Sequence, residues 1–452
     1  MFQDSQKQKI IDTLTNLLVP GGKYKFSPYI ELAQYKVLFD EVVDSSKRRE
    51  QLKKIIKKHG SRIESIANKI SEFFLKKEFT REKYADPLFL DTYFVHYFPV
   101  NVCKMQHMML ELLQQDAIGE SLRIVDIGVG TGTTAVAILD FLLATKTVAV
   151  MNGAPFDIRD IKIICVDVNE NPLSYSKRVL EAYREQLNSS SLDGEIGDYK
   201  KILIDCIDSI KYVKHDINSL DLNLMDNNPD LVIASNVLNE LTDNGKNNLY
   251  MSLNSLHDGA LIILAEPGSK TASQNLMYFR KQLSSSGKFS SFSPCVDGVA
   301  DHSSCSSCWN RRSKGFNQPL LYMETHKLLD EESKKRFTEQ DNDLLSWSSA
   351  IFRKSSRSVQ EPQVENEYRF ISSYTLRDYE VLKCCAAGSG HSSLEVHRPY
   401  GIEIPPLFYG QKMVITDAKK EVNSGTLVVK LDTNSCVKTK QREKEAFFDS
   451  YS

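Results

Sequence analysis

The chain has 452 residues, of which 41% are hydrophobic and 26% are charged, and its formal net charge at pH 7 is −2. These values are ordinary for a globular protein of two or three domains, and they exclude a polycation that binds nucleic acid over its whole surface. No apolar run approaches the roughly 20 residues that span a bilayer, and residues 1–7 lack the apolar core of a signal peptide. We therefore expect a cytoplasmic protein that does not bind a membrane.

The first 115 residues form an N-terminal region with helical periodicity. Apolar residues recur at intervals of three and four around Ile10 and Leu14. Residues 47–58 hold seven basic residues and one acid around three apolar positions, which predicts a basic amphipathic helix. Two interpretations of its basic side stay open, a solvated helix face and a surface that contacts RNA phosphates.

Residues 116–290 alternate strand-like apolar runs with helical segments. Strands are predicted at 123–127, 161–168, 210–215, 231–235 and 260–265, and helices at 133–145, 173–188, 244–256 and 273–285. This alternation predicts an α/β domain with a parallel sheet covered on both faces, whose ligands bind at the carboxyl ends of the strands. Polar insertions near 146–160 and 188–208 are expected to lengthen two loops.

The rest of the chain changes in character several times. Residues 291–330 form a cysteine-rich insertion, and residues 331–366 are expected to form a helix followed by a linker. Short strand-like runs separated by turns then predict a small, OB-like β module over residues 367–435. The polar tail, residues 436–452, is expected to fray.

The most informative motif is the glycine-rich turn of residues 126–134, which reads Asp-Ile-Gly-Val-Gly-Thr-Gly-Thr-Thr. It lies between a predicted strand and a predicted helix, where free backbone N–H groups and closely approaching glycines suit a ligand. The spacing is Gly-x-Gly-x-Gly rather than the Gly-x-Gly-x-x-Gly of dinucleotide-binding proteins. It resembles the first motif of class I S-adenosylmethionine (SAM) methyltransferases. That resemblance implies that Asp126, Gly128, Gly130 and Gly132 hold the methionine and ribose parts of SAM.

Polar residues after three later strands extend this candidate site. Asp167 ends the second predicted strand, where an acid can accept hydrogen bonds from both ribose hydroxyls of an adenosine. Asp216 ends the third strand, the place where class I methyltransferases carry an acid that contacts the adenine amino group. Asn236 follows the fourth strand and is expected to face the ligand.

No catalytic residue is evident from the sequence. Amino-directed enzymes of this fold often carry an Asp/Asn-Pro-Pro-Tyr tetrad after the fourth strand, where this chain reads Ser-Asn-Val-Leu over residues 235–238. No cysteine stands where a cytosine-C5 enzyme needs its nucleophile. A pocket that binds SAM without methylating anything is therefore an open alternative.

Three cysteines, Cys295, Cys305 and Cys308, lie within 14 residues, away from any apolar pattern. Thiolates are soft ligands, and a tetrahedral metal site needs a fourth. The candidates for that fourth ligand are Cys384 and Cys385, with His302 as a nitrogen alternative. Spacing alone does not separate an iron–sulfur cluster from a zinc site.

Five segments, taken together and in this order, resemble one family: the aromatic segment 93–100, the glycine-rich turn 126–133, the strand and helix 230–241, the Glu-Pro-Gly turn 264–268, and the cysteine-rich segment 295–312. The family is that of the mitochondrial small-ribosomal-subunit assembly methyltransferase-like proteins and their bacterial relatives. The Glu-Pro-Gly turn followed by the cysteine-rich segment is the specific part of the match, because ordinary methyltransferases lack it.

The resemblance implies a Rossmann-like class I SAM-methyltransferase domain and a [4Fe–4S] cluster on Cys295, Cys305, Cys308 and Cys385, with Cys384 as the alternative fourth ligand. It also implies binding to small-subunit ribosomal RNA (rRNA). The expected protein is a SAM-dependent rRNA methyltransferase or a methyltransferase-like assembly factor of the small ribosomal subunit. The alternatives are a non-catalytic RNA-binding scaffold and a small-molecule or protein methyltransferase with a structural zinc site.

Overall fold

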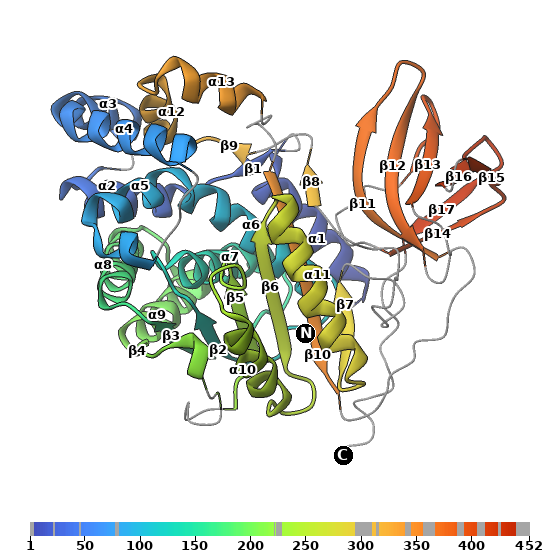
Figure 1. Ribbon diagram of the computed structural model, residues 1–452, viewed down its shortest axis with the longest axis horizontal. Coiled ribbons are helices and arrows are strands. Elements are labelled where there is room, and N and C mark those ends of the chain that lie inside the picture. Colours follow the sequence, from blue (N-terminus) through green and yellow to red (C-terminus); the bar gives the residue numbers. More distant parts are fainter. Residues whose placement is uncertain are drawn as a thin grey trace. The chain divides into compact units, whose positions relative to one another are not determined.

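The computed structural model describes residues 4–20, 23–44, 47–76, 81–220, 222, 228–293, 310–312, 316–339, 345–355, 367–386, 393–404, 412–423 and 426–439. The chain divides into two compact units, and each is assembled from separate stretches of sequence. Unit 1 comprises Met1–Leu110, Gly119–Leu220 and Lys314–Leu345, and unit 2 comprises Glu111–Ile118, Asp221–Ser313 and Ser346–Ser452. Figure 1 labels the helices and strands.

The larger sheet has the strand order β4-β3-β2-β5-β6-β10-β7, and β8 pairs with β10. The pairs β2–β3, β3–β4 and β5–β6 are parallel, whereas β10 is antiparallel to both β6 and β7. The five parallel strands follow the order 3-2-1-4-5 of a doubly wound fold, which confirms the predicted α/β class. The strands are β2 (Ser121–Ile127), β3 (Asp160–Asp167), β4 (Lys211–Lys214), β5 (Leu231–Ser235), β6 (Leu261–Pro267), β7 (Phe289–Ser293), β8 (Asn310–Arg312) and β10 (Leu345–Lys354).

The central strands contain apolar runs because helices cover them. Ile163 on β3, Ile233 on β5 and Ile263 on β6 are all buried. In unit 1, α8 (Glu170–Ser189) and α9 (Gly194–Asp208) pack on β3. In unit 2, α11 (Lys270–Ser285) packs on β6 and β7, and α10 (Asp243–Asn254) precedes β6 in the chain. Continuous apolar strands are typical of parallel sheets buried on both faces.

Helix α7 (Thr133–Met151) is the only helix among the described residues that is long and apolar enough to cross a membrane. This finding corrects the expectation that no apolar run approaches that length. Most of the helix is buried, and it packs against α1 (Asp4–Leu18), α8 and α9 in unit 1. A helix that is apolar all round is either a core helix or a membrane span, and its contacts with three helices account for its composition.

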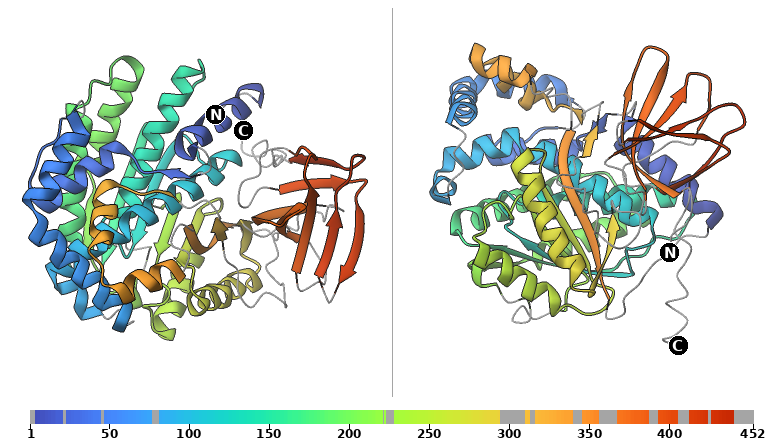
Figure 2. Two further views of the ribbon diagram at one scale, coloured as in Figure 1. Left: turned by 90° about the horizontal axis from the view of Figure 1, so that it is seen from above. Right: turned by 45° about the vertical axis from the view of Figure 1, so that its right-hand side comes forward.

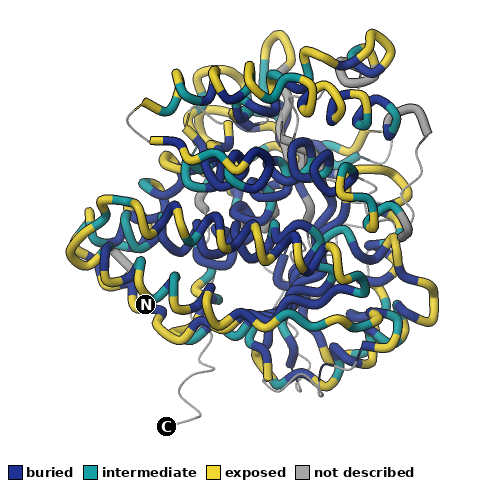
Figure 3. Tube along the Cα trace, turned by 90° about the vertical axis from the view of Figure 1, so that its left-hand side faces the viewer, coloured by how far each residue is buried: buried dark blue, intermediate teal, exposed yellow. Residues whose placement is uncertain are grey.

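The helical part of unit 1 is built from both ends of that unit's sequence. Helices α4 and α5 contact α12, and α4 also contacts α13, so these four lie together (Figure 1). On α4 the buried residues Ile63, Ile66 and Ile70 share one helical face. Figure 3 shows buried and exposed residues alternating along the helices. The bounds are α2 (Pro28–Phe39), α3 (Arg48–Lys58), α4 (Gly60–Lys76), η3 (Arg81–Ala85), α5 (Pro87–His96), α6 (Phe98–Gln114), α12 (Leu320–Lys327) and α13 (Glu331–Glu339), with β1 (Tyr24–Lys25) parallel to β9 (Phe316–Asn317).

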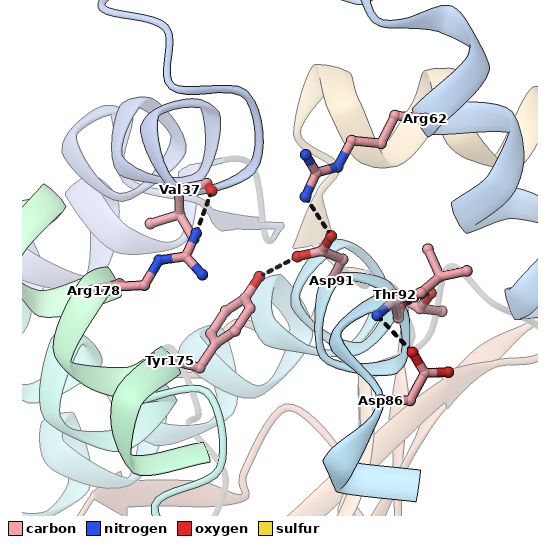
Figure 4. A network of polar contacts seen from close by, with 8 residues as sticks. Val37, Arg62, Asp86, Asp91, Thr92, Tyr175 and Arg178 are labelled. Carbon is pink, nitrogen blue, oxygen red and sulfur yellow. Dashed lines mark hydrogen bonds and ion pairs between the residues drawn. The ribbon is translucent and has the colours of Figure 1, made fainter. Parts of the chain in front are cut away.

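A polar network joins these helices to α8 of the sheet-covering layer (Figure 4). The buried carboxylate of Asp91 on α5 accepts hydrogen bonds from Arg62 (2.6 Å) and from the Tyr175 hydroxyl (2.9 Å). Arg178 lies over the Tyr175 ring at 5.3 Å and donates to the Val37 carbonyl at 2.9 Å. One carboxylate thus connects helices α4, α5 and α8, and the neighbouring arginine extends the network to α2.

The C-terminal strands form a second sheet of unit 2 with the order β15-β16-β13-β12-β11-β14-β17, shown from further sides in Figure 2. Seven strands exceed the five of an OB fold, and β17 lies where a frayed tail is expected. The core includes Phe370, Val396 and Met413. The bounds are β11 (Glu367–Thr375), β12 (Tyr379–Ala386), β13 (Ser393–Pro399), β14 (Lys412–Thr416), β15 (Lys419–Asn423), β16 (Thr426–Lys430) and β17 (Cys436–Thr439).

Two segments differ from the sequence expectation. Residues 345–354 form β10, although a linker is expected there, because their partners on β6 lie about 80 residues earlier in the chain. Residues 194–208 form α9, although a polar loop is expected there. The buried residues of α9, Tyr199, Leu203, Cys206 and Ile207, share one helical face, so the periodicity is present beneath the polar composition.

Candidate functional site

The glycine-rich turn connects β2 to α7 in unit 1, as the sequence predicts. Gly128, Gly130 and Gly132 have φ values of 73°, 52° and 78°, all in the left-handed region. The N–H groups of Gly128 and Val129 donate to the Val166 carbonyl at 2.8 and 3.0 Å. The turn is therefore folded back onto the carboxyl end of β3, and only glycine adopts this series of conformations without strain.

Gly132 also sets how closely two helices approach. A Cβ atom at this position would lie 2.7 Å from the Ser176 Oγ atom and 3.2 Å from the Ser176 Cα atom on α8. Gly132 stands at the N-terminal cap of α7, and its carbonyl accepts from the Val136 N–H at 3.2 Å. The third glycine is needed for packing as well as for backbone conformation.

Asp126 is a completely buried carboxylate near the end of β2. Neither of its side-chain oxygens has a hydrogen-bond partner among the described residues. Burial raises the pKa of Asp126 to about 7, the charge of Asp167 raises it further, and the nearby Thr134 side chain partly offsets both. A buried acceptor without a donor is costly unless a ligand supplies one, so Asp126 fits a group with hydroxyl or ammonium donors.

Asp167 ends β3 and links that strand to the glycine-rich turn. One carboxylate oxygen accepts from the Gly130 N–H at 3.2 Å, and the other accepts from the Asn169 N–H at 3.0 Å. Each oxygen of an ionised carboxylate has room for a second donor. The structure thus brings together two acids and three glycines that the sequence predicts as one site.

Asp216 follows β4 in the same unit, next to the end of β3, because the His215 N–H donates to the Asp167 carbonyl at 2.9 Å. Asp216 is exposed and caps the short helix η4 (Ile217–Ser219). One of its oxygens accepts from both the backbone and the side-chain nitrogen of Asn218 at 3.0 Å. Its predicted contact with adenine stays a prediction.

Unit 2 contributes a separate polar cluster where β5 and β6 end. Asn236 follows β5 with a φ of 60°, and its N–H donates to the Ala265 carbonyl at 2.7 Å. Asparagine is one of the few residues that adopt the left-handed region readily. The left-handed backbone conformation is by itself a sufficient reason for an asparagine at position 236. The predicted contact of Asn236 with a ligand therefore stays a prediction.

Glu266, the acid of the Glu-Pro-Gly turn, holds the segment after β5 in place. It is buried, accepts from the Leu238 N–H at 2.8 Å, and accepts from the Asn239 side chain. The Asn275 side chain in turn donates to Asn239 at 2.7 Å. Burial raises the pKa of Glu266 to about 8, although these donors lower it. The sequence contains the signal for this role, an acid directly after an apolar strand, but the partners became evident only in the structure.

The predicted metal ligands Cys295, Cys305 and Cys308, and the alternative His302, lie outside the described residues. Cys385 lies on β12, and its side chain is also outside them. The Cys384 thiol is buried in the core of the second sheet, and burial raises its pKa. Cys384 therefore packs as a small apolar residue, which weakens its case as the fourth ligand. Among the residues that are described, no group of three or more His, Cys, Asp or Glu side chains is arranged to hold a metal.

The strand order, with the antiparallel β10 between β6 and β7, and the glycine-rich turn after β2 define a class I methyltransferase fold. Residues 91–371 match the model of the family described as Rsm22, mitochondrial small ribosomal subunit. Because this match covers more than half of the chain, the chain belongs to the Rsm22 family.

Solved structures with similar folds are methyltransferases. They include the glycopeptide N-methyltransferase MtfA (16% identity, TM-score 0.23, covering 37% of this chain and 54% of MtfA). A TehB-like SAM-dependent methyltransferase from Corynebacterium glutamicum has 11% identity and a TM-score of 0.28, covering 54% of this chain and 87% of that one. The small RNA methyltransferase HEN1 has 14% identity and a TM-score of 0.30, covering 57% of this chain and 26% of HEN1. The chain thus spans about half the length of MtfA. A comparison with curated proteins finds no match.

Proposed function

We propose that this protein binds SAM in unit 1 and acts in the assembly of the small ribosomal subunit, with small-subunit rRNA as its partner. Membership of the Rsm22 family carries the ribosomal part of this proposal. The unpartnered, buried Asp126 carboxylate beside three left-handed glycines carries the SAM part. The cytoplasmic location and the absence of membrane binding expected from the sequence belong to the same proposal.

The residues of unit 1 have complementary roles in this proposal. Asp126 and the turn of Gly128, Gly130 and Gly132 receive the methionine end and the ribose of SAM, because glycines let a ligand approach the backbone closely and the acid lacks a donor. Asp167, whose carboxylate is held at the end of β3 by the Gly130 and Asn169 N–H groups, is the proposed acceptor for the ribose hydroxyls. Bound SAM would supply an electrophilic methyl group.

Asp216 is proposed to contact the adenine, and the predicted ligand contact of Asn236 stays a proposal of its own. Methyl transfer needs an in-line approach of the acceptor, and positioning supplies much of the rate. A second candidate function is a scaffold that binds SAM without methylating a substrate. Two observations on the segment that follows β5 favour it. The Asn239 side chain in that segment donates to Glu266 on β6, and the segment lacks the Asp/Asn-Pro-Pro-Tyr tetrad.

The test of the proposal uses the full-length protein with SAM and with an in vitro transcript of the small-subunit rRNA. We expect saturable SAM binding by calorimetry, and RNA affinity that falls as salt concentration rises. Methylation of the transcript or of isolated small subunits distinguishes an enzyme from a scaffold. Methylation of free peptides or small molecules with the rRNA untouched would favour the third alternative, an enzyme of a different substrate class.

A [4Fe–4S] cluster on Cys295, Cys305, Cys308 and Cys385 is also part of the proposal, with zinc as the alternative. Its support is the cysteine spacing together with the family resemblance. Protein purified without oxygen is expected to contain roughly four irons and four sulfides per chain and to absorb broadly near 400 nm, as cubane clusters held by cysteines do. Stoichiometric zinc without sulfide would replace the cluster by a structural zinc site, and a metal-free protein would remove the metal proposal altogether.

A further inference from the structure

Helix α3 of unit 1 and its cap form a strongly basic segment in a chain whose overall formal net charge is −2. Seven of the twelve residues from Lys47 to Lys58 are basic, and Glu50 is the only acid among them. The structure divides these seven side chains into two groups, according to whether a carboxylate already neutralises them.

Three of the basic side chains are paired. Arg48 contacts the buried Glu31, Lys54 lies 2.6 Å from Glu50, and Lys58 lies 2.5 Å from Glu41. The other four, Lys47, Arg49, Lys53 and Lys57, are exposed and have no ion pair or hydrogen bond of their side chains within the described part of the chain. The positive charges on this segment that no described carboxylate neutralises are therefore those of Lys47, Arg49, Lys53 and Lys57.

Three of the unpaired residues, Arg49, Lys53 and Lys57, are spaced at i, i+4 and i+8 and form a single row along the helix, here called the basic stripe. Successive members lie about 6 Å apart along the helix axis, and the row is about 12 Å long. One strand of a nucleic-acid duplex presents a phosphate roughly every 3.4 Å along its axis. The basic stripe therefore matches the length of a few consecutive phosphates.

The opposite side of α3 is not available to a partner. Leu52 and Ile55 are only 2% and 6% exposed, because they pack inside unit 1. A basic helix that binds a lipid surface or a helix-binding groove needs a free apolar face to insert. In this protein only the charged face is exposed, which favours a partner recognised by charge alone.

We propose that the basic stripe on α3 binds the phosphate backbone of RNA without reading its sequence. This inference rests on the proposed function, which supplies RNA as the partner. The inference adds the surface of the protein that contacts the RNA. Lysine and arginine side chains that are not neutralised by the protein release counterions when they contact phosphates, which is the main source of sequence-independent affinity.

The helix itself offers a matched control. Lys53→Gln/Lys57→Gln and Lys54→Gln/Lys58→Gln each remove two lysines four residues apart on α3, and glutamine keeps helix propensity nearly unchanged. Both variants lower the net charge equally, but only the first removes unpaired charges. Affinity of the full-length protein for the small-subunit rRNA transcript is measured from low to high salt, alongside binding to vesicles of phosphatidylcholine and phosphatidylserine.

We expect Lys53→Gln/Lys57→Gln to make the salt dependence of log K shallower by roughly 1.4–1.8 and to weaken binding roughly tenfold at low salt. Lys54→Gln/Lys58→Gln should stay near the wild type. Equal weakening by both variants, or an unchanged Lys53→Gln/Lys57→Gln variant, overturns the inference while the proposed function stands. Loss of vesicle binding with RNA binding intact overturns it in favour of a lipid surface. A wild-type protein without salt-dependent RNA affinity overturns the proposed function as well.

Discussion

Replacing Asp126 with asparagine is expected to weaken SAM binding by at least a hundredfold. The carboxylate is fully buried and lacks a donor, so hydroxyl or ammonium groups of a ligand would become its partners. Charged hydrogen bonds are roughly twice as strong as neutral ones. The amide of asparagine keeps one acceptor but places two donors where the ligand also brings donors. Calorimetric titration of SAM into both proteins measures the difference.

The same residue predicts how SAM affinity changes with pH. The pKa of Asp126 is about 7 in the free protein, chiefly because of burial. A ligand that donates to Asp126 binds its ionised form, so affinity should fall as pH drops below 7, approaching tenfold per pH unit. Asp126→Asn should lack this dependence on pH.

Asp160→Asn is the control for both measurements, because Asp160 starts the neighbouring strand, is exposed, and pairs with Lys162 at 3.1 Å. Its SAM affinity and pH profile should match those of the wild type. If Asp126→Asn also bound SAM with the wild-type affinity and pH profile, Asp126 would not be a ligand contact and the proposed SAM site in unit 1 would fail.

The sequence predicts where the proposed cofactor-binding residues of unit 1 lie in the fold, because these residues are close together in the chain. Asp126 and the three glycines lie within seven residues, and their backbone conformations follow from residue types that adopt positive φ. Asp167 is equally predictable, since the carboxyl ends of neighbouring parallel strands lie at one edge of a sheet. The lack of a partner for Asp126 is not predictable, because it depends on every group that surrounds the carboxylate.

Features that depend on residues far apart in the chain cannot be predicted from the sequence for a related reason. Strand β10 pairs with β6 across about 80 residues, and no local pattern encodes a partner at that distance. The two groups of basic residues on α3 can be distinguished from the sequence only in part, through the i, i+4 spacing of Glu50 and Lys54. Lys54 differs from Lys53 only because Glu50 lies one helical turn before it, and Lys58 differs from Lys57 because the chain places Glu41 beside it.

Replacing Asp140 with alanine is expected to lower the free energy of unfolding of the helical part of unit 1 by about 3–5 kcal/mol. Asp140 on α7 is buried and accepts from Ser27 at 2.6 Å, Gln106 at 2.9 Å and Tyr183 at 3.2 Å. These donors come from the cap of α2, from α6 and from α8. Alanine leaves all three without their acceptor in a site with little water access, and each unmet buried donor costs about 1–3 kcal/mol.

Asp140→Asn distinguishes the lost hydrogen bonds from the lost charge. Burial raises the pKa of Asp140 to about 6, against the donors that lower it. Since the folded-state pKa lies above the ordinary value, the stability that Asp140 contributes is fully present below about pH 4 and is lost as pH rises through 6. Asparagine keeps an acceptor for Ser27 and Tyr183, and the amide of Gln106 can rotate to present its oxygen. We therefore expect Asp140→Asn to lower the free energy of unfolding by less than about 1 kcal/mol at pH 8 and to remove the dependence of stability on pH that Asp140 causes.

Urea denaturation at pH 4 and pH 8, combined with hydrogen exchange of α2, α6 and α8, measures these effects. Asp157→Ala is the control, because its exposed carboxylate pairs with Arg159 at the surface and should contribute less than about 1 kcal/mol. Equal stability of Asp140→Ala and Asp157→Ala would mean that Ser27, Gln106 and Tyr183 find other acceptors or water. Asp140 would then not be the acceptor that joins α2, α6 and α8 around α7. A large loss in Asp140→Ala with faster exchange in all three helices would show that this buried carboxylate holds them together, although its own ionisation opposes folding above pH 6.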